Sequence, residues 1–189
     1  NRKTIDYPSQ KTEEDVADFN AKMENGRIVS GTIFKSWMNG TRPFEISYNA
    51  DGTMKQTRYN DISEYDGSDD WDNHTFVWEN GYLTKVKCES MDAVSTFAYD
   101  KTTTIPAPFD KALDLNMLML LEEAEFFDGT NGQILNVLAI GGKLGTRSKG
   151  LIKEYHCDWT EDAPFTLKMT YKKLTSDEVI VEVNHYENN

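Results

Sequence analysis

The sequence has few of the residues from which several common kinds of site are built. Its two cysteines, Cys88 and Cys157, are too few for a disulfide framework or for a structural zinc site of the cysteine-rich kind. Its three histidines, His74, His156 and His185, occur in neither the H-E-x-x-H nor the H-x-x-E-H spacing of zinc hydrolases. No stretch approaches the about 20 apolar residues of a membrane-spanning helix.

Positive charge is also scarce. The chain has 20 Lys and Arg against 32 Asp and Glu, a formal net charge of −12. Binding to nucleic acid or to an anionic membrane surface needs clustered cations, so the composition excludes a general binder of either.

Sequence patterns of common enzymes are missing as well. There is no Gly-x-Ser-x-Gly elbow around Ser148, and the glycine-rich segment 141–145 lacks the Gly-Lys-Ser/Thr ending of a phosphate-binding loop. His156 and Cys157 are neighbours, but adjacent strand residues point to opposite faces and cannot form a nucleophile–base pair. No carboxylate pair stands out for glycoside hydrolysis. We therefore expect a non-enzymatic protein.

Aromatic residues are plentiful, with 9 Phe, 9 Tyr and 4 Trp, and 38% of the 189 residues are hydrophobic. Side chains of this size bury enough surface for a real core, which excludes global disorder. The length suits one domain, since independent cores usually take roughly 100–200 residues.

Most of the chain has the period-2 alternation of β-strands. Phe44, Ile46 and Tyr48 alternate with polar residues before the turn signal Asp51-Gly52, and Phe76 and Trp78 do the same before Asn80-Gly81. Three further alternating segments, 151–159, 165–171 and 179–186, close the chain. Repeated hairpins of this kind predict an antiparallel meander in which successive strands pair in order.

Two segments favour helix instead. In 12–24, Thr12 is a suitable N-cap, Val16, Phe19 and Met23 share one helical face, and Gly26 suits the C-terminal cap. The dense apolar segment 114–127 predicts a second, buried helix that begins at Asp114.

The predicted fold class is thus mainly β: an antiparallel β-meander forming an open or partly closed barrel, with two short helices. We expect an N-terminal segment, residues 1–27, that contains the first helix. A single β-meander domain follows over residues 28–189, with a helical insertion near 114–127.

Three short motifs carry a family resemblance. They are Ala112-Leu113-Asp114-Leu115-Asn116-Met117-Leu118, the loop from Gly142 to Leu151, and the aromatic hairpin from Thr75 to Leu83. In this order they resemble an exported or lipid-anchored family from gut and oral Bacteroidetes, a domain of unknown function with a porin-like β-fold. The resemblance spans roughly residues 28–186, and the closing hairpin departs from it where Thr160–Pro164 replaces an Asp-x-x-Gly turn.

The resemblance implies a location as well as a fold. It suggests an exported protein, periplasmic or on the cell surface, anchored through an upstream lipoprotein signal, and it provides no catalytic residues. Because the chain starts at Asn1 rather than methionine, we expect it to be a processed product.

An acidic run offers a candidate metal site. Oxygen ligands, which Ca²⁺ prefers, stand at alternate positions: Asp66, Ser68, Asp70 and Asp72. The candidate metal ligands among them are the carboxylates of Asp66, Asp70 and Asp72. The run does not match a helix–loop–helix calcium loop, because Trp71 stands where glycine is needed and Val77 where the bidentate glutamate belongs. The alternative is a solvated acidic turn, without any cofactor.

Two tryptophans are candidates for ligand binding. Trp37, beside Asn39, and Trp71, within the acidic run, could stack on sugar rings of a glycan; alternatively both are packing or loop residues. An amphipathic, lipid-like ligand would instead need an apolar cavity, whose candidate lining is Leu115, Met117, Leu118, Leu120, Leu121, Leu167 and Met169. These residues could equally well fill the core.

The leading hypothesis is a non-enzymatic cell-envelope protein that binds a glycan or an amphipathic small ligand. The alternative is a structural or assembly partner that docks another envelope protein at an exposed sheet edge. An uncharacterised hydrolase is a third and weaker hypothesis. The two cysteines, both on apolar strand faces, either pair across the sheet or remain buried thiols.

Overall fold

The fold is known from a computed structural model. It describes residues 2–5, 12–15, 17–35, 41–62, 69–90, 92–106, 116–117, 139, 141–158, 164–175 and 177–187. Within these residues, no helix has both the length and the apolar character needed to cross a membrane.

Ten strands form one antiparallel sheet, and their order in the sheet is their order in the chain. They are β3 (Ala17–Glu24), β4 (Arg27–Lys35), β5 (Thr41–Tyr48), β6 (Met54–Ile62), β7 (Asp69–Glu79), β8 (Tyr82–Cys88), β9 (Ala93–Asp100), β10 (Leu151–Asp158), β11 (Phe165–Leu174) and β12 (Val179–Glu187). Two earlier strands, β1 (Arg2–Ile5) and β2 (Thr12–Asp15), pair only with each other. The predicted meander is confirmed.

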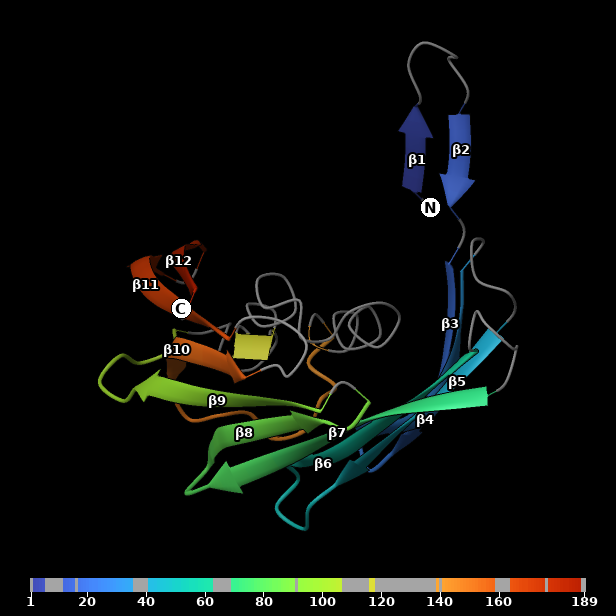
Figure 1. The fold of residues 1–189 in the computed structure, drawn as a ribbon, viewed down its shortest axis with the longest axis horizontal. Helices are drawn as coiled ribbons and strands as arrows, with labels where there is room; N and C mark the ends of the chain where they lie inside the picture. Colours follow the sequence, from blue (N-terminus) through green and yellow to red (C-terminus); the bar gives the residue numbers. More distant parts are fainter. Residues whose placement is uncertain are drawn as a thin grey trace.

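The large sheet curves into an open, barrel-like trough, with β3 and β12 as its two edges (Figure 1). Register shifts interrupt the β3–β4, β5–β6, β7–β8, β9–β10 and β11–β12 ladders. An extra residue in one strand of a pair increases local twist and bend, so these bulges explain the strong curvature. The β1–β2 hairpin projects away from the trough (Figure 1).

The tight turns follow the sequence signals. Asn80 and Gly81 both have positive φ angles, 53° and 82°, as a two-residue hairpin turn of type I′ requires. Asn25 and Gly26, at 51° and 76°, make an equivalent turn between β3 and β4. Gly26 therefore lies in a hairpin turn after β3, where the sequence predicted the C-terminal cap of a helix.

The predicted helix over 12–24 is wrong, because this segment forms β2 and β3. β3 pairs with β4 along its whole length. The ring of Phe19 stacks on that of Phe44, with centroids 5.5 Å apart, whereas Met23 is 49% exposed. Pairing with neighbouring strands thus outweighs a helical pattern that rested on three apolar residues. Of the second predicted helix, Asn116 and Met117 are helical, and the rest of 114–127 lies outside the described residues.

One face of the sheet, here called the inner face, is buried, and the other faces solvent. Along β5 the burial alternates, so that Phe44 and Ile46 are 2% and 4% exposed while their neighbours are open to solvent. The inner face also carries Phe76, Val86, Tyr155 and Leu167, and Met117, Ala139 and Leu144 pack into the same core. The core therefore lies within the trough.

Candidate functional site

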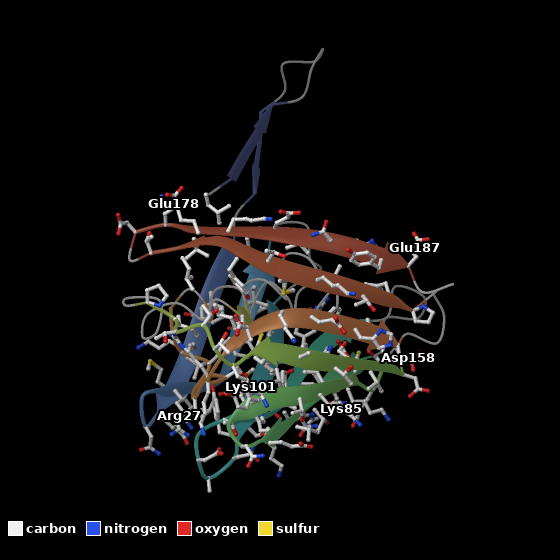
Figure 2. All side chains as sticks on the ribbon, turned by 90° about the vertical axis from the view of Figure 1, so that its left-hand side faces the viewer. Arg27, Lys85, Lys101, Asp158, Glu178 and Glu187 are labelled. Carbon is white, nitrogen blue, oxygen red and sulfur yellow. The ribbon has the colours of Figure 1, made fainter. Side chains whose placement is uncertain are left out.

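The ladder between β10 and β11 is incomplete. The two strands pair from Glu154 opposite Lys168 to Cys157 opposite Phe165. Beyond this point β11 continues to Leu174 alongside β12. On its other side β10 stays paired with β9 through Leu151 and Ile152, and Lys153 is an extra residue at a register shift. The two strands converge toward Asp158 and separate toward the end where Glu178 lies (Figure 2). The residues around this opening line a cavity, here called the cleft.

Side chains satisfy the main chain of β10 where β11 has moved away. Tyr171 donates its hydroxyl hydrogen to the carbonyl oxygen of Ile152 (2.8 Å). The amide of Asn116 donates to the carbonyl oxygen of Gly150 (2.7 Å) and accepts from the backbone N–H of Ile152 (2.9 Å). Buried main-chain groups need such partners, so these bonds stabilise the open ladder. Burial also raises the pKa of Tyr171, which keeps its hydroxyl a neutral donor.

The cleft has a volume of about 600 Å³. This volume lies in the range of about 300–1,000 Å³ that is usual for small-molecule sites. Among the described residues it is lined by Tyr99, Asp100, Lys101, Thr102, Thr103, Lys153, Met169, Thr170, Tyr171 and Leu174.

The lining is amphipathic. Met169 is 5% exposed, and with Tyr171 and Leu174 it forms the apolar part. Lys101 and Lys153 are exposed and supply two ammonium groups. The ammonium of Lys101 lies 5.1 Å from the ring centre of Tyr82, a cation–π arrangement that holds it near the sheet.

The one carboxylate among these lining residues is already satisfied. Asp100 accepts hydrogen bonds from the N–H and hydroxyl of Thr102 (2.8 and 2.6 Å) and from the N–H of Thr103 (3.2 Å), as well as from the Thr103 hydroxyl. These bonds favour the ionised form and hold the pKa of Asp100 well below its usual range. Asp100 thus shapes the turn after β9, and the two lysines remain for a ligand.

The residues predicted to line an apolar cavity have different positions in the structure. Met169 lines the cavity, whereas Leu167 and Met117 are buried in the core. Leu115, Leu118, Leu120 and Leu121 lie outside the described residues.

Of the two predicted glycan-stacking residues, the structure describes Trp71. Trp37 lies outside the described residues. Trp71 is half-buried on the outer face, with the guanidinium carbon of Arg58 4.6 Å from its ring centre. Arg58 also donates to Asn73 (3.2 Å) and pairs with Glu45 (3.3 Å). One ring face of Trp71 is therefore occupied by a neighbouring side chain.

Two of the predicted calcium ligands, Asp70 and Asp72, belong to β7. Asp66 and the side chain of Asp70 lie outside the described residues, and the main chain of Asp70 pairs with Asp61 within the β6–β7 ladder. The structure brings Asp72 together with His74 and Cys88 on the inner face. Sequence spacing does not reveal this group, because Cys88 meets Asp72 and His74 only through the register of the β7–β8 hairpin.

Both cysteines are buried free thiols. Cys88 lies on β8 opposite Ala93, and Cys157 lies on β10 opposite Ser95. The strand β9 stands between them, which explains the absence of a disulfide between these two residues.

Comparison with solved structures shows the same architecture elsewhere. A porin-like protein from Bacteroides uniformis matches with a TM-score of 0.55 and 16% identity, over 98% of this chain and 77% of that one. A DUF3836 family protein from Parabacteroides distasonis matches over 47% of this chain and 78% of that one, with a TM-score of 0.31 and 15% identity. No protein-family model and no curated protein matches the sequence. The first match shows that the chain has a porin-like β fold.

Proposed function

We propose that the protein is a non-enzymatic binding module that holds an amphipathic small ligand with an anionic group in the cleft between β10 and β11. The observation that carries this proposal is the opening of the β10–β11 ladder around a cavity of about 600 Å³. The apolar part of the ligand packs on Met169, Tyr171 and Leu174. Its anionic group lies near the ammonium groups of Lys101 and Lys153.

The charge of the protein makes this arrangement selective. The net charge is −12, so the protein as a whole repels anions, while the cleft lining carries two ammonium groups against one carboxylate, that of Asp100. A local cationic site on an acidic protein favours anionic ligands only where these cations lie. The main-chain groups of Ile152 are occupied by Asn116 and Tyr171, so the cleft is preorganised before the ligand arrives.

The proposal includes a location. We infer that the protein acts in the cell envelope, in line with the family resemblance of its motifs and with a porin-like protein as the structural match. Cell fractionation of the native protein, with detection in the envelope or in the cytoplasm, tests this part separately.

Binding can be tested by calorimetry with a medium-chain fatty acid and the corresponding neutral alcohol. We expect saturable binding of the acid at one site and weaker binding of the alcohol. The double variant Lys101→Gln, Lys153→Gln should bind the acid about fivefold more weakly, because each exposed ion pair contributes about 0.2–1 kcal/mol. The matched control is Lys85→Gln, an exposed lysine of β8 outside the cavity lining.

Three results would overturn the proposal. They are no binding of the acid by the folded protein, equal binding of acid and alcohol, or an equal effect of Lys85→Gln and the double variant. Binding of an uncharged oligosaccharide in place of the acid would point to the glycan hypothesis instead.

A further inference from the structure

Asp72, His74 and Cys88 form a compact group of metal-ligating side chains on the inner face, outside the lining of the cleft. Each offers one ligand atom, and these atoms all lie within 4.8 Å of one another. We propose that this group binds one Zn²⁺-type transition-metal ion through the carboxylate of Asp72, the imidazole of His74 and the thiolate of Cys88.

The sheet brings these three residues together. Asp72 and His74 are two positions apart on β7, so their side chains lie on the same face. Cys88 ends β8 directly opposite His74 in the β7–β8 ladder. All three ligands thus belong to one hairpin, whose strands are fixed on both sides by β6 and β9.

The spacing fits a tetrahedral ion. The distance from Nδ1 of His74 to Oδ2 of Asp72 is 3.7 Å, and that from Sγ of Cys88 to Oδ1 of Asp72 is 3.5 Å. A tetrahedral Zn²⁺ with bonds of about 2.0–2.3 Å separates its ligand atoms by about 3.3–3.8 Å. Both separations lie in this range; they end on different oxygens of Asp72, so binding through one of these oxygens requires the carboxyl group to rotate.

The donor atoms select the kind of metal. Sulfur, imidazole nitrogen and a carboxylate oxygen suit Zn²⁺ and neighbouring transition metals, whereas Ca²⁺ takes oxygen ligands in larger number. The charges also balance, since a dication with one carboxylate and one thiolate is neutral. Neutrality matters here because the His74 side chain is 1% exposed and Cys88 is fully buried.

The hydrogen bonds of Asp72 show what metal binding would displace. The thiol of Cys88 donates to Oδ1 of Asp72, and the hydroxyl of Ser90 donates to the same oxygen (2.5 Å). When the ion binds, the S–H bond of Cys88 breaks, a sulfur–metal bond forms, and the proton passes to solvent. The Asp72 side chain is 21% exposed and provides the entrance. The exposed Ser90, whose oxygen lies 3.3 Å from the Cys88 sulfur, borders the group on the same side.

The experiment uses the full chain after dialysis against a chelator. Titration with Co²⁺, followed by absorbance, reports a thiolate–cobalt charge-transfer band, and calorimetry with Zn²⁺ gives stoichiometry and affinity. We expect one ion per chain and release of about one proton near neutral pH. Cys88→Ser should abolish the charge-transfer band. Cys157→Ser is the matched control, since Cys157 is also a buried free thiol but lies on β10, and it should keep the band.

A second variant keeps the proposal testable if Cys88→Ser does not fold. Asp72→Asn alters a partly exposed carboxylate and should weaken Zn²⁺ binding at least about tenfold, with the fold verified by circular dichroism. No Zn²⁺ binding by the unmodified chain, or a band that survives Cys88→Ser or is lost in Cys157→Ser, would overturn the proposal. Lys101→Gln and Lys153→Gln should leave metal binding unchanged, so failure of this site and failure of the ligand cleft are distinguishable.

Discussion

The hydroxyl of Tyr171 donates a hydrogen bond of 2.8 Å to the carbonyl oxygen of Ile152 across the cleft between β10 and β11. In a complete ladder a strand N–H would occupy that position. A side chain that replaces it lets the two strands part without leaving a buried carbonyl unsatisfied. The bond therefore keeps the cleft open and the sheet intact.

Removing this hydroxyl should destabilise the protein. We expect Tyr171→Phe to lower the free energy of unfolding by about 1–3 kcal/mol, the usual cost of a buried polar group that loses its partner. Urea denaturation followed by circular dichroism measures the change. Tyr186→Phe is the matched control, because Tyr186 is 48% exposed, and it should change stability by less than about 0.5 kcal/mol. Equal stability of the two variants would contradict this role of Tyr171.

Gly31 is needed where β4 crosses the ring of Phe44. A Cβ at Gly31 would lie 2.6 Å from two atoms of that ring and would also meet the carbonyl oxygen of Asn20. We expect Gly31→Ala to destabilise the protein by about 1–3 kcal/mol through overpacking, measured by thermal and urea unfolding. The same substitution in a Phe44→Ala background should cost less, since part of the clash is gone. An equal cost in both backgrounds would exclude the ring as the cause.

Tyr48 should make the protein sensitive to alkaline pH. Burial raises its pKa from 10.0 to about 12, and its hydroxyl donates to the carbonyl oxygen of Ile28 (2.8 Å). A pKa raised on folding stabilises the native state fully below the unfolded value, and this contribution disappears as the pH rises through the folded value. The difference in unfolding free energy between the wild type and Tyr48→Phe should therefore be constant below about pH 10 and fall above it. The phenolate absorbance of the wild type minus that of Tyr48→Phe should show its step near pH 12. A step near pH 10 in this difference would refute the assignment.

Asp100 should contribute to acid sensitivity in the opposite direction. Hydrogen bonds from Thr102 and Thr103 lower its pKa below the ordinary 3.8. A pKa lowered on folding stabilises the protein above the ordinary value, and the contribution is lost as the pH falls through the folded value. Asp100→Asn should therefore reduce stability at neutral pH and lose this effect in strong acid. Unfolding midpoints across an acid series measure it, with Glu79→Gln, an exposed acid at the end of β7, as the control. An Asp100→Asn effect that is the same at all pH values would contradict the assignment.

The hairpins could be predicted because their signals are local. Asn80-Gly81 needs only two residues that tolerate positive φ, and alternation of Phe76 and Trp78 with polar residues indicates the strand before it. The closing strands agree with prediction to within a few residues, since 151–159 is observed as Leu151–Asp158. Each of these features depends on neighbours in the chain.

The failures depend on distant contacts. Phe19 and Met23 have helical spacing, yet Phe19 finds its partner in Phe44, a residue of β5, and Met23 remains exposed. Asn116 is helical, as predicted for 114–127, but the bonds of its side chain to main-chain groups of Gly150 and Ile152 were not predicted. No local pattern in the sequence shows such pairings.

The sequence by itself determined a meander, because turn residues and period-2 alternation are properties of neighbouring residues. The tertiary structure decided where the ladder of β10 and β11 opens and which side chains meet. In the β7–β8 hairpin, Glu79 pairs with Tyr82, and continuing that register would place Cys88 opposite Asn73. Instead, Trp78 pairs with Leu83 and Val77 with Lys85, so Thr84 is an extra residue. One extra residue in a period of two turns every later side chain to the other face. That bulge brings Cys88 to His74.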